Sequence, residues 1–238
     1  MKQVQRILLA LVMVSICFVI YQQKTEITIM DERITGTCRQ VQIISKNIDK
    51  IYGTVYEKLD LSVLASCGII TDSMGHGSCV AISPNIILTA GHCLDKEGAW
   101  VEIGGIKYEI IDKWKSDKYD IGFVEIDGIV PYVIFGKMPE LLQTVYKIGF
   151  PVQLEFKNFI ATGIISNLDT DYYIWHNIII LDSPGIRGQS GCAVFNINGE
   201  LVAIHVGHIS YGFGVEEPVS HIQEALEDYD AKRIREKT

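Results

Sequence analysis

Nine short runs of apolar and β-branched residues follow one another between residues 63 and 207. They read VLASCGII, SCVAI, IILTA, WVEIGGIKYEIID, IGFVEI, ATGIIS, YYIWHNIIIL, CAVFNING and LVAIHVG, and they are separated by glycine, proline, asparagine or aspartate. Such runs favour β-strands, and such separators favour turns. Strands repeated at this spacing predict a β-sandwich or a β-barrel, so we expect an all-β fold.

The last part of the chain changes to helical spacing. After Pro218, the residues Ile222, Ala225 and Leu226 form one apolar face, and acidic residues precede basic ones. This order of charges suits the dipole of a helix. We therefore expect a closing helix whose charged end spans 227–238.

Composition limits the classes of function. Hydrophobic residues make up 48% of the 238 positions, and 21 glycines outnumber 6 prolines, which is typical of a globular, turn-rich protein with a substantial core. The net charge is −8. A surface that neutralises phosphates needs the opposite sign, so nucleic acid is not expected as a partner.

The N-terminus has the pattern of an export signal. Lys2 and Arg6 precede a stretch without charges, 7–21, which ends before Gln22. Fifteen residues are fewer than the ~20 of a spanning helix, but flanking residues can extend such a stretch into a signal anchor. Large residues occupy the place where a cleavage site needs small ones. We therefore expect 1–24 to be an uncleaved membrane anchor, with the rest of the chain outside the cytoplasm.

Other interpretations of this end stay open. A cleaved signal peptide would make the protein secreted, Cys17 in a partial lipobox would be lipidated, and a buried helix would belong to the fold itself. Segment 25–60 carries apolar residues at helical spacing from Val41 to Val55, interrupted by Gly53, and predicts a helical stalk. Its length leaves the oligomeric state open.

Three segments carry a possible base, acid and nucleophile, in that order. Segment 88–93 (LTAGHC) contains His92, segment 119–126 (YDIGFVEI) contains Asp120, and segment 188–195 (GQSGCAVF) contains Ser190. Glycines around a serine leave its hydroxyl exposed and allow backbone N–H groups to approach a reacting atom. Each segment alone is common, but the three together are a much more specific pattern.

Together the segments resemble the trypsin-like (chymotrypsin-fold) serine peptidases, most closely the bacterial HtrA-like and glutamyl endopeptidase branches. TAGHC is similar to TAAHC of that family, and GQSGCAVFN to its GNSG-[GS]-P-V-[FL]-N. IGFP followed by ATGIIS is similar to a stretch of the HtrA-like branch, and GELVAIHVG to the strand that lines the substrate pocket. The resemblance covers roughly 61–226. It implies two packed six-stranded antiparallel β-barrels, with the site between them and a C-terminal helix.

The resemblance also implies roles for these residues. His92 would take the proton of Ser190, Asp120 would orient the imidazole, and the N–H groups of Gly188 and Ser190 would form the oxyanion hole. No metal or cofactor is needed. Three other acids, Asp112, Asp117 and Asp127, lack the small apolar residues that follow Asp120.

Specificity is predicted from positions around the serine. Pro184 stands where trypsin keeps the acid that binds lysine or arginine, so a tryptic preference is not expected. His205, followed by Val206 and Gly207, matches a histidine that binds acidic or amide side chains in glutamyl endopeptidases and viral 3C-type peptidases. This favours Glu or Gln before the scissile bond (P1), although Gly185 lacks the hydroxyl of the glutamyl enzymes. A purely structural role for His205 stays open.

The cysteine pattern favours disulfides over a metal site. The family resemblance implies a Cys79–Cys93 bridge, and Cys67–Cys79 competes, because a hairpin near Ser73 would place those two opposite each other. The chain has no CxxC pair, and the spacing of His205 and His208 suits zinc poorly. Cys192 replaces the glycine or serine of many family members, and its bulk could press on the oxyanion loop.

The sequence therefore predicts a serine endopeptidase that acts on peptides or proteins and is tethered to the membrane by its N-terminal segment. One alternative is a peptidase-fold module that binds peptides without cutting them. Another is an enzyme that releases itself by cutting within 25–60.

Overall fold

The structure, a computed structural model, describes residues 60–72, 75–95, 100–152, 158–209 and 212–236. The chain divides into two compact units, Met1–Glu57 and Lys58–Thr238, and the described residues all belong to the second. The predicted anchor (1–24) and the predicted stalk (25–60), apart from Asp60, lie outside the described residues. None of the described helices is long and apolar enough to cross a membrane.

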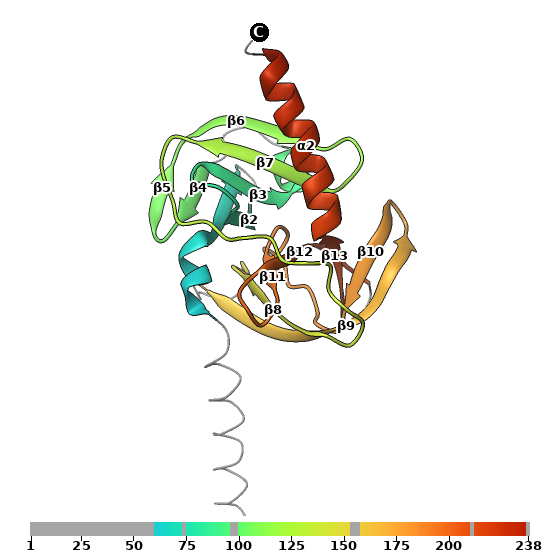
Figure 1. Cartoon of the computed structure of the whole chain (residues 1–238). Helices are drawn as coiled ribbons and strands as arrows, with labels where there is room; N and C mark the ends of the chain where they lie inside the picture. Colours follow the sequence, from blue (N-terminus) through green and yellow to red (C-terminus); the bar gives the residue numbers. More distant parts are fainter. Residues whose placement is uncertain (1–59, 73–74, 96–99, 153–157, 210–211, 237–238) are drawn as a thin grey trace, which may run out of the picture. The chain divides into compact units, whose positions relative to one another are not determined.

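The first half of the described chain forms a seven-stranded antiparallel sheet in the order β5-β4-β1-β2-β3-β7-β6 (Figure 1). Its strands are β1 (Cys67–Asp72), β2 (Gly75–Ala81), β3 (Ile86–Ala90), β4 (Trp100–Ile103), β5 (Ile106–Tyr108), β6 (Ile110–Lys115) and β7 (Ile121–Ile126). Buried residues such as Ile70, Ile87 and Val124 form its core.

The second half closes into a six-stranded antiparallel barrel in the order β10-β13-β12-β11-β8-β9. Its strands are β8 (Thr144–Gly149), β9 (Phe159–Tyr172), β10 (Trp175–Leu181), β11 (Ala193–Phe195), β12 (Leu201–Ile209) and β13 (Phe213–Pro218). Val145, Ile165, Leu181 and Val194 belong to the core of this barrel.

The predicted all-β fold, with two curled antiparallel sheets and a C-terminal helix, is confirmed, with one difference. The first sheet has seven strands among the described residues instead of the expected six of a barrel. The extra strand arises because Glu109 lies outside the strands, so the segment 106–115 forms two strands, β5 and β6, instead of one. Gly104 and Gly105, with φ of 61° and 80°, make the two-residue hairpin between β4 and β5. Two successive positive φ values are what such tight hairpins require.

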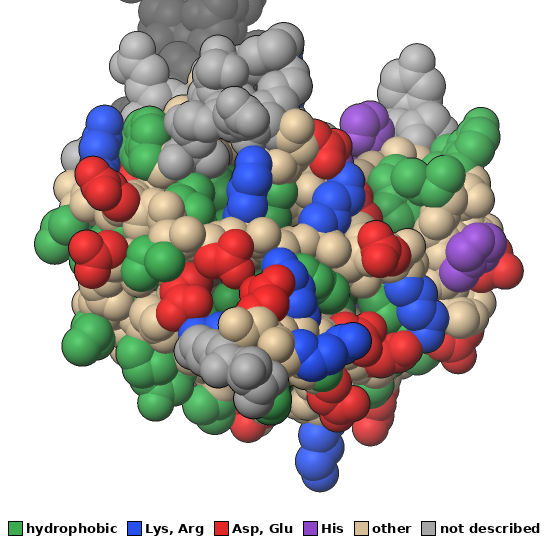
Figure 2. All heavy atoms as spheres, turned by 90° about the horizontal axis from the view of Figure 1, so that it is seen from above, with side chains coloured by type: hydrophobic (Ala, Val, Ile, Leu, Met, Phe, Trp, Pro, Cys, Tyr) green, Lys and Arg blue, Asp and Glu red, His purple; other side chains and the backbone are tan. Residues whose placement is uncertain are grey.

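Helix α2 (Val219–Glu236) starts at the end of β13 and joins the two halves. Tyr229 packs against Trp114 of β6 and Phe123 of β7, and Arg233 Nη2 donates to both carboxylate oxygens of Glu125 at 2.9 Å. The helix runs without a break through the predicted boundary between residues 226 and 227. Figure 2 shows acidic and basic side chains interspersed on the face seen from above, so neither sign of charge dominates there.

Three of the nine apolar runs differ from the prediction. The run WVEIGGIKYEIID contributes to three strands, β4, β5 and β6. The first half of VLASCGII belongs to a 3-10 helix, η1 (Leu61–Ser66), which Asp60 caps by accepting a hydrogen bond from the Ser62 N–H at 2.9 Å. The run YYIWHNIIIL contains a turn, so it contributes the end of β9 and all of β10. Strand β13 was not predicted at all.

Candidate active site

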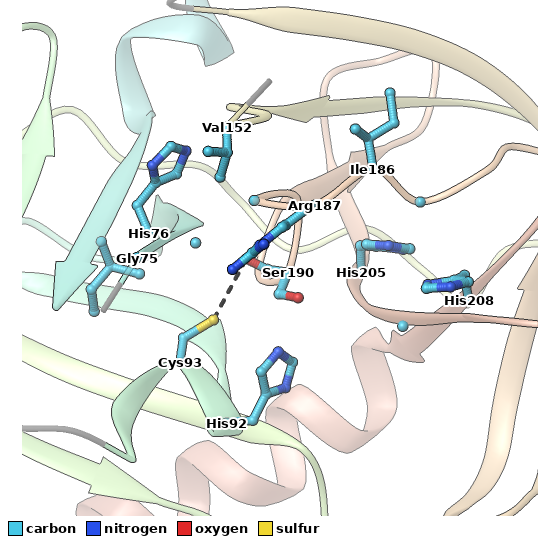
Figure 3. A pocket seen from close by; sticks show the side chains of 15 residues that line it. Gly75, His76, His92, Cys93, Val152, Ile186, Arg187, Ser190, His205 and His208 are labelled. Atoms are coloured by element: carbon cyan, nitrogen blue, oxygen red, sulfur yellow. Dashed lines mark hydrogen bonds between the residues drawn. The ribbon is translucent and has the colours of Figure 1, made fainter. Parts of the chain in front are cut away.

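A pocket of about 730 Å³ is lined by residues of both halves of the described chain. His76 of β2, and His92 and Cys93 of the short 3-10 helix η2 (Gly91–Leu94), come from the first half. Ser190 and His205 come from the second. In Figure 3, His92 and Ser190 both open into this pocket, and His205 lies on the far side of Ser190 from His76. The structure thus brings the predicted base and nucleophile to one cavity.

His92 and Asp120 form a two-point contact. The ring Nδ1 of His92 lies 2.7 Å from Asp120 Oδ2, and the backbone N–H of His92 donates to Asp120 Oδ1 at 2.9 Å. The Gly91 N–H also donates to the Asp120 carbonyl at 3.0 Å. Both oxygens of the carboxylate are therefore used as acceptors, which fixes the ring and its orientation toward the pocket.

Asp120 is held in turn by Glu217, at the end of β13. Glu217 Oε1 accepts from the backbone N–H of Asp120 at 3.1 Å, and its Oε2 lies 2.7 Å from Nδ1 of His221 on α2. The ring of His221 stacks on Tyr119 with centroids 4.0 Å apart. The strand end that carries Asp120 is thus tied to the barrel and to the helix.

The contact between His92 and Asp120 shifts the pKa values of the two side chains in opposite directions. The hydrogen bond to Asp120, with a smaller contribution from Cys93, raises the pKa of His92 from 6.5 to about 10 despite partial burial. Burial raises the pKa of Asp120, but the hydrogen bonds and charge of His92 outweigh it and hold that pKa below 3.8. Asp120 is therefore the ionised partner over the physiological range.

The loop that carries Ser190 is fixed by hydrogen bonds to β2 and β12. The Ser190 carbonyl accepts from the Ser78 N–H at 2.7 Å, and the Gly191 N–H donates to the His205 carbonyl at 2.7 Å. Ser78 Oγ donates to the Gly188 carbonyl and accepts from the Phe150 N–H, both at 2.9 Å. Ser78 thus connects this loop to both halves of the protein.

The two predicted oxyanion donors are oriented by their neighbours. The Arg187 carbonyl accepts from the Val152 N–H at 2.9 Å, and the Gln189 carbonyl accepts from the Cys192 N–H at 2.8 Å. Because C=O and N–H point in opposite directions across a trans peptide bond, the N–H groups of Gly188 and Ser190 face away from these acceptors. Within the described residues neither N–H donates to another protein group. Both are available to an incoming oxygen.

Gly191 is required by sterics as well as by backbone conformation. Its φ is +83°, and a Cβ there would lie 2.2 Å from the Ser78 carbonyl oxygen and 2.3 Å from Thr89 Oγ1.

We expect Gly191→Ala to lower the free energy of unfolding by about 3 kcal/mol or more, as measured by urea denaturation. Gly104→Ala is the matched control, since Gly104 has a positive φ but open space around it. It should lose only about 1 kcal/mol. Equal losses would show that the steric conflict is relieved.

Cys192 does not press on the oxyanion loop. Its side chain is fully buried against Gly149, where an added Cβ would lie 2.6 Å from Cys192 Cβ. Burial raises the pKa of the Cys192 thiol well above its usual value. The glycine of IGFP thus provides the room that a cysteine needs beside the loop that carries Ser190.

Three of the predicted substrate-binding residues, Gly185, His205 and Gly207, line the pocket. Val206 is buried away from it, as alternation along a strand requires, and Pro184 is exposed outside it. A Cβ on Gly185 would lie 2.4 Å from His205 Nε2. The hydroxyl residue of the glutamyl enzymes therefore has no room here, because the imidazole fills its place.

The predicted Cys79–Cys93 disulfide is not formed, because all four described cysteines are free. Cys93 Sγ turns instead toward the Ser190 carbonyl, 3.8 Å away, while Cys79 packs in the core. The competing Cys67–Cys79 bridge fails by one residue: β1 and β2 do pair as a hairpin, but Cys67 lies opposite Val80 and Cys79 opposite Gly68. A shift of one residue turns the side chains to opposite faces.

Several residues of the site were not predicted from the sequence. Arg187 extends over the pocket beside Ser190, and His76 borders it with Nε2 2.8 Å from the Phe150 carbonyl (Figure 3). The buried Lys147 donates to the carbonyls of Ser183 and Pro184, at 3.2 and 3.0 Å. A lysine within the apolar strand TVYKIG was the available sequence signal. In the described part of the chain, no group of three or more His, Cys, Asp or Glu side chains is arranged to hold a metal.

Known serine proteases are similar to this chain in sequence. The mouse protein "Serine protease HTRA4" is 25% identical over 184 residues, 71% of this chain and 37% of that protein. "Serine protease HtrA-like" of Staphylococcus aureus is 26% identical over 137 residues, 51% of this chain and 18% of that protein. The chain thus spans well under two thirds of the length of these curated relatives.

Solved structures share the fold. The serine endoprotease from Yersinia pestis has a TM-score of 0.64 at 24% identity, covering 73% of this chain and 65% of that one. The active form of the Rv3671c protease from M. tuberculosis has a TM-score of 0.65 at 15% identity, covering 74% and 85%. The profile of the trypsin-like peptidase domain matches residues 77–204. That match covers more than half of the 238 residues, and the chain therefore belongs to the trypsin-like peptidase family.

Proposed function

We propose that this protein is a serine endopeptidase in which His92, Asp120 and Ser190 form the catalytic triad. The observation that carries the proposal is the contact of His92 with both Asp120 oxygens at the edge of a pocket that also holds Ser190. Membership of the family supports peptides or proteins as substrates.

The proposed reaction begins when Ser190 Oγ attacks a peptide carbonyl carbon while its proton moves to Nε2 of His92. The carbonyl oxygen becomes an oxyanion, which the N–H groups of Gly188 and Ser190 stabilise. The imidazolium then gives its proton to the leaving amine, the C–N bond breaks, and an acyl ester on Ser190 remains. Water then hydrolyses the ester: His92 takes a proton from the attacking water and returns it to Ser190 Oγ as the ester C–O bond breaks. Asp120 stabilises the imidazolium throughout.

The pH dependence follows from the raised pKa of His92. The ring must lose its proton before it can accept one from Ser190, so kcat/KM for a peptide with an uncharged P1 side chain should increase with pH above 6.5, with a midpoint near pH 10. A midpoint at or below 6.5 would contradict the role of Asp120 in raising this pKa.

The pocket beyond Ser190 supports a preference for Glu or Gln at P1. His205 and Gly207 border this part of the cavity, and His205 presents a ring nitrogen suited to a polar side chain. A cleavage screen over matched peptides that differ only at P1 tests the proposal. We expect Glu or Gln to be cut faster than Ala or Leu. Equal rates would contradict the preference, and tight binding of peptides without cleavage would favour the alternative of a peptide-binding module.

We further propose that the protein works outside the cytoplasm, anchored by 1–24. The support is the sequence alone: Lys2 and Arg6 before an uncharged stretch. In cells, the full chain should sediment with membranes, resist extraction at high salt and be released by detergent. Recovery of a shortened protein from the medium would instead indicate a cleaved signal or self-release.

A further inference from the structure

The inner end of the pocket contains a buried histidine–glutamate pair. His205 on β12 and Glu216 on β13 lie directly opposite each other in the strand register. Nδ1 of His205 is 2.9 Å from Glu216 Oε1, and the two side chains are 3% and 0% exposed. The other oxygen, Glu216 Oε2, is buried without a hydrogen-bond partner among the described residues. The carboxylate therefore directs its interaction at the imidazole.

The other ring nitrogen of His205, Nε2, forms no hydrogen bond with any group in the described part of the chain. It lies close to Gly185, and both residues line the pocket. Figure 3 shows the ring at the border of the cavity, beside Ser190. A P1 side chain that enters this end of the cavity meets Nε2.

The pairing determines what Nε2 can do. An ionised carboxylate only accepts hydrogen bonds, so the proton of a neutral imidazole stays on Nδ1 and Nε2 becomes an acceptor. Burial lowers the pKa of His205 below 6.5, against the opposing effect of Glu216. At neutral pH, the ring therefore offers a lone pair to the pocket.

The charges around His205 balance without a ligand. The groups that face it are Glu216 on β13, the buried ammonium of Lys147 on β8 and His208 further along β12, and the thiol of Cys192 lies in the same cluster. The positive charge of Lys147 and the negative charge of Glu216 offset each other. A P1 glutamate that reached Nε2 would place its carboxylate against the lone pair of that nitrogen unless His205 took up a proton, whereas a glutamine amide adds no charge and can donate to Nε2.

We propose that Glu216 is a positioning residue that fixes His205 as a hydrogen-bond acceptor, so that the site selects glutamine over glutamate at P1 and accepts glutamate only as His205 gains a proton. This inference rests on the proposed peptidase function. The family resemblance predicts Glu or Gln at P1, and this inference chooses between the two.

The test compares kcat/KM for two peptides that differ only in Gln or Glu at P1, between pH 5 and 8.5, with the full chain. The ratio cancels the titration of His92, which affects both peptides equally. At pH 8 we expect glutamine to be favoured by at least about tenfold, and the advantage to decrease below pH 6.5 by up to about tenfold per pH unit. A ratio that does not change with pH, or a preference for glutamate at pH 8, would overturn the inference.

Substitutions add a second readout. Glu216→Gln leaves Lys147 uncompensated and frees the tautomer of His205, so the Gln/Glu ratio at pH 8 should fall below one. Glu227→Gln, the same change at an exposed position of α2, should leave the ratio unchanged. If the buried variant does not fold, the pH profile of the parent still decides.

The two levels of the proposal fail in different ways. Cleavage of peptides with other P1 residues, without a preference for glutamine, overturns the role of Glu216 alone. No cleavage of any peptide, together with a Ser190 that does not react with a serine-directed probe, overturns the peptidase function and this inference with it.

Discussion

Replacing the proposed nucleophile or the proposed base should abolish nearly all hydrolysis: Ser190→Ala and His92→Ala should each lower kcat by about 10⁴-fold or more. In the proposed reaction Ser190 supplies the atom that attacks and His92 takes up its proton, with the imidazole Nδ1 held 2.7 Å from Asp120 Oδ2. Because the two residues act as a unit, the double variant should be no slower than either single variant. Steady-state or single-turnover cleavage of one peptide by all three variants measures this.

Ser166→Ala serves as the control for the first prediction, because Ser166 is an exposed serine on β9. It should keep the parent rate. Losses that multiply in the double variant would show that Ser190 and His92 contribute independently, which contradicts a triad. The melting temperatures of all variants should stay close to that of the parent, since His92 is well exposed and Ser190 borders a cavity.

The second large effect is expected at the acid. Asp120→Asn should lower kcat by roughly 10⁴-fold near pH 7. Both Asp120 oxygens accept hydrogen bonds, one from the His92 N–H and one from Nδ1. An asparagine offers one oxygen and one NH₂ group, so one of these contacts meets a donor. If the amide NH₂ faces Nδ1, the ring proton moves to Nε2, which can then no longer accept the proton of Ser190.

Asp112→Asn, Asp117→Asn and Asp127→Asn are the matched controls, since these acids compete with Asp120 in the sequence. Each should retain the parent kcat within a few fold. Loss of activity in one of them, with Asp120→Asn active, would assign the orienting acid elsewhere. Asp120→Asn should also shift the rise of kcat/KM to lower pH, because the group that raises the pKa of His92 is gone.

Much of the site could be predicted because its chemistry is local in sequence. Gly188 and Gly191 flank Ser190 in one short segment, and the structure gives both a positive φ, 96° and 83°. The alternating strand after Asp120 likewise predicts β7. Short-range features of this kind need no knowledge of which strands pair.

The parts that escaped prediction depend on contacts between distant strands. Strand β13 (Phe213–Pro218) carries Glu216 and Glu217, and two adjacent acids are atypical of a buried strand. Each acid has a hydrogen-bond partner in its buried position: Glu216 contacts the imidazole of His205, and Glu217 accepts from the backbone N–H of Asp120. The partners lie on β12, on α2 and in the loop before β7, so only the folded chain shows why the charges are there.

The register of strand pairing likewise limits what the sequence can predict. The hairpin between β1 and β2 was expected near Ser73, but the pairing of Cys67 depends on a single residue of register. Two consecutive positions in a strand point to opposite faces, so an error of one residue changes a possible disulfide into two separate thiols. Composition and turn residues do not determine register at that resolution.

The most direct test of the account is the reaction of the full chain with a fluorophosphonate probe, which needs no known substrate. We predict labelling of the parent at Ser190, and its loss in Ser190→Ala and in His92→Ala, because only a serine activated by a neighbouring base reacts. Labelling that persists in His92→Ala, or a folded parent that stays unlabelled at alkaline pH, would contradict an activated Ser190.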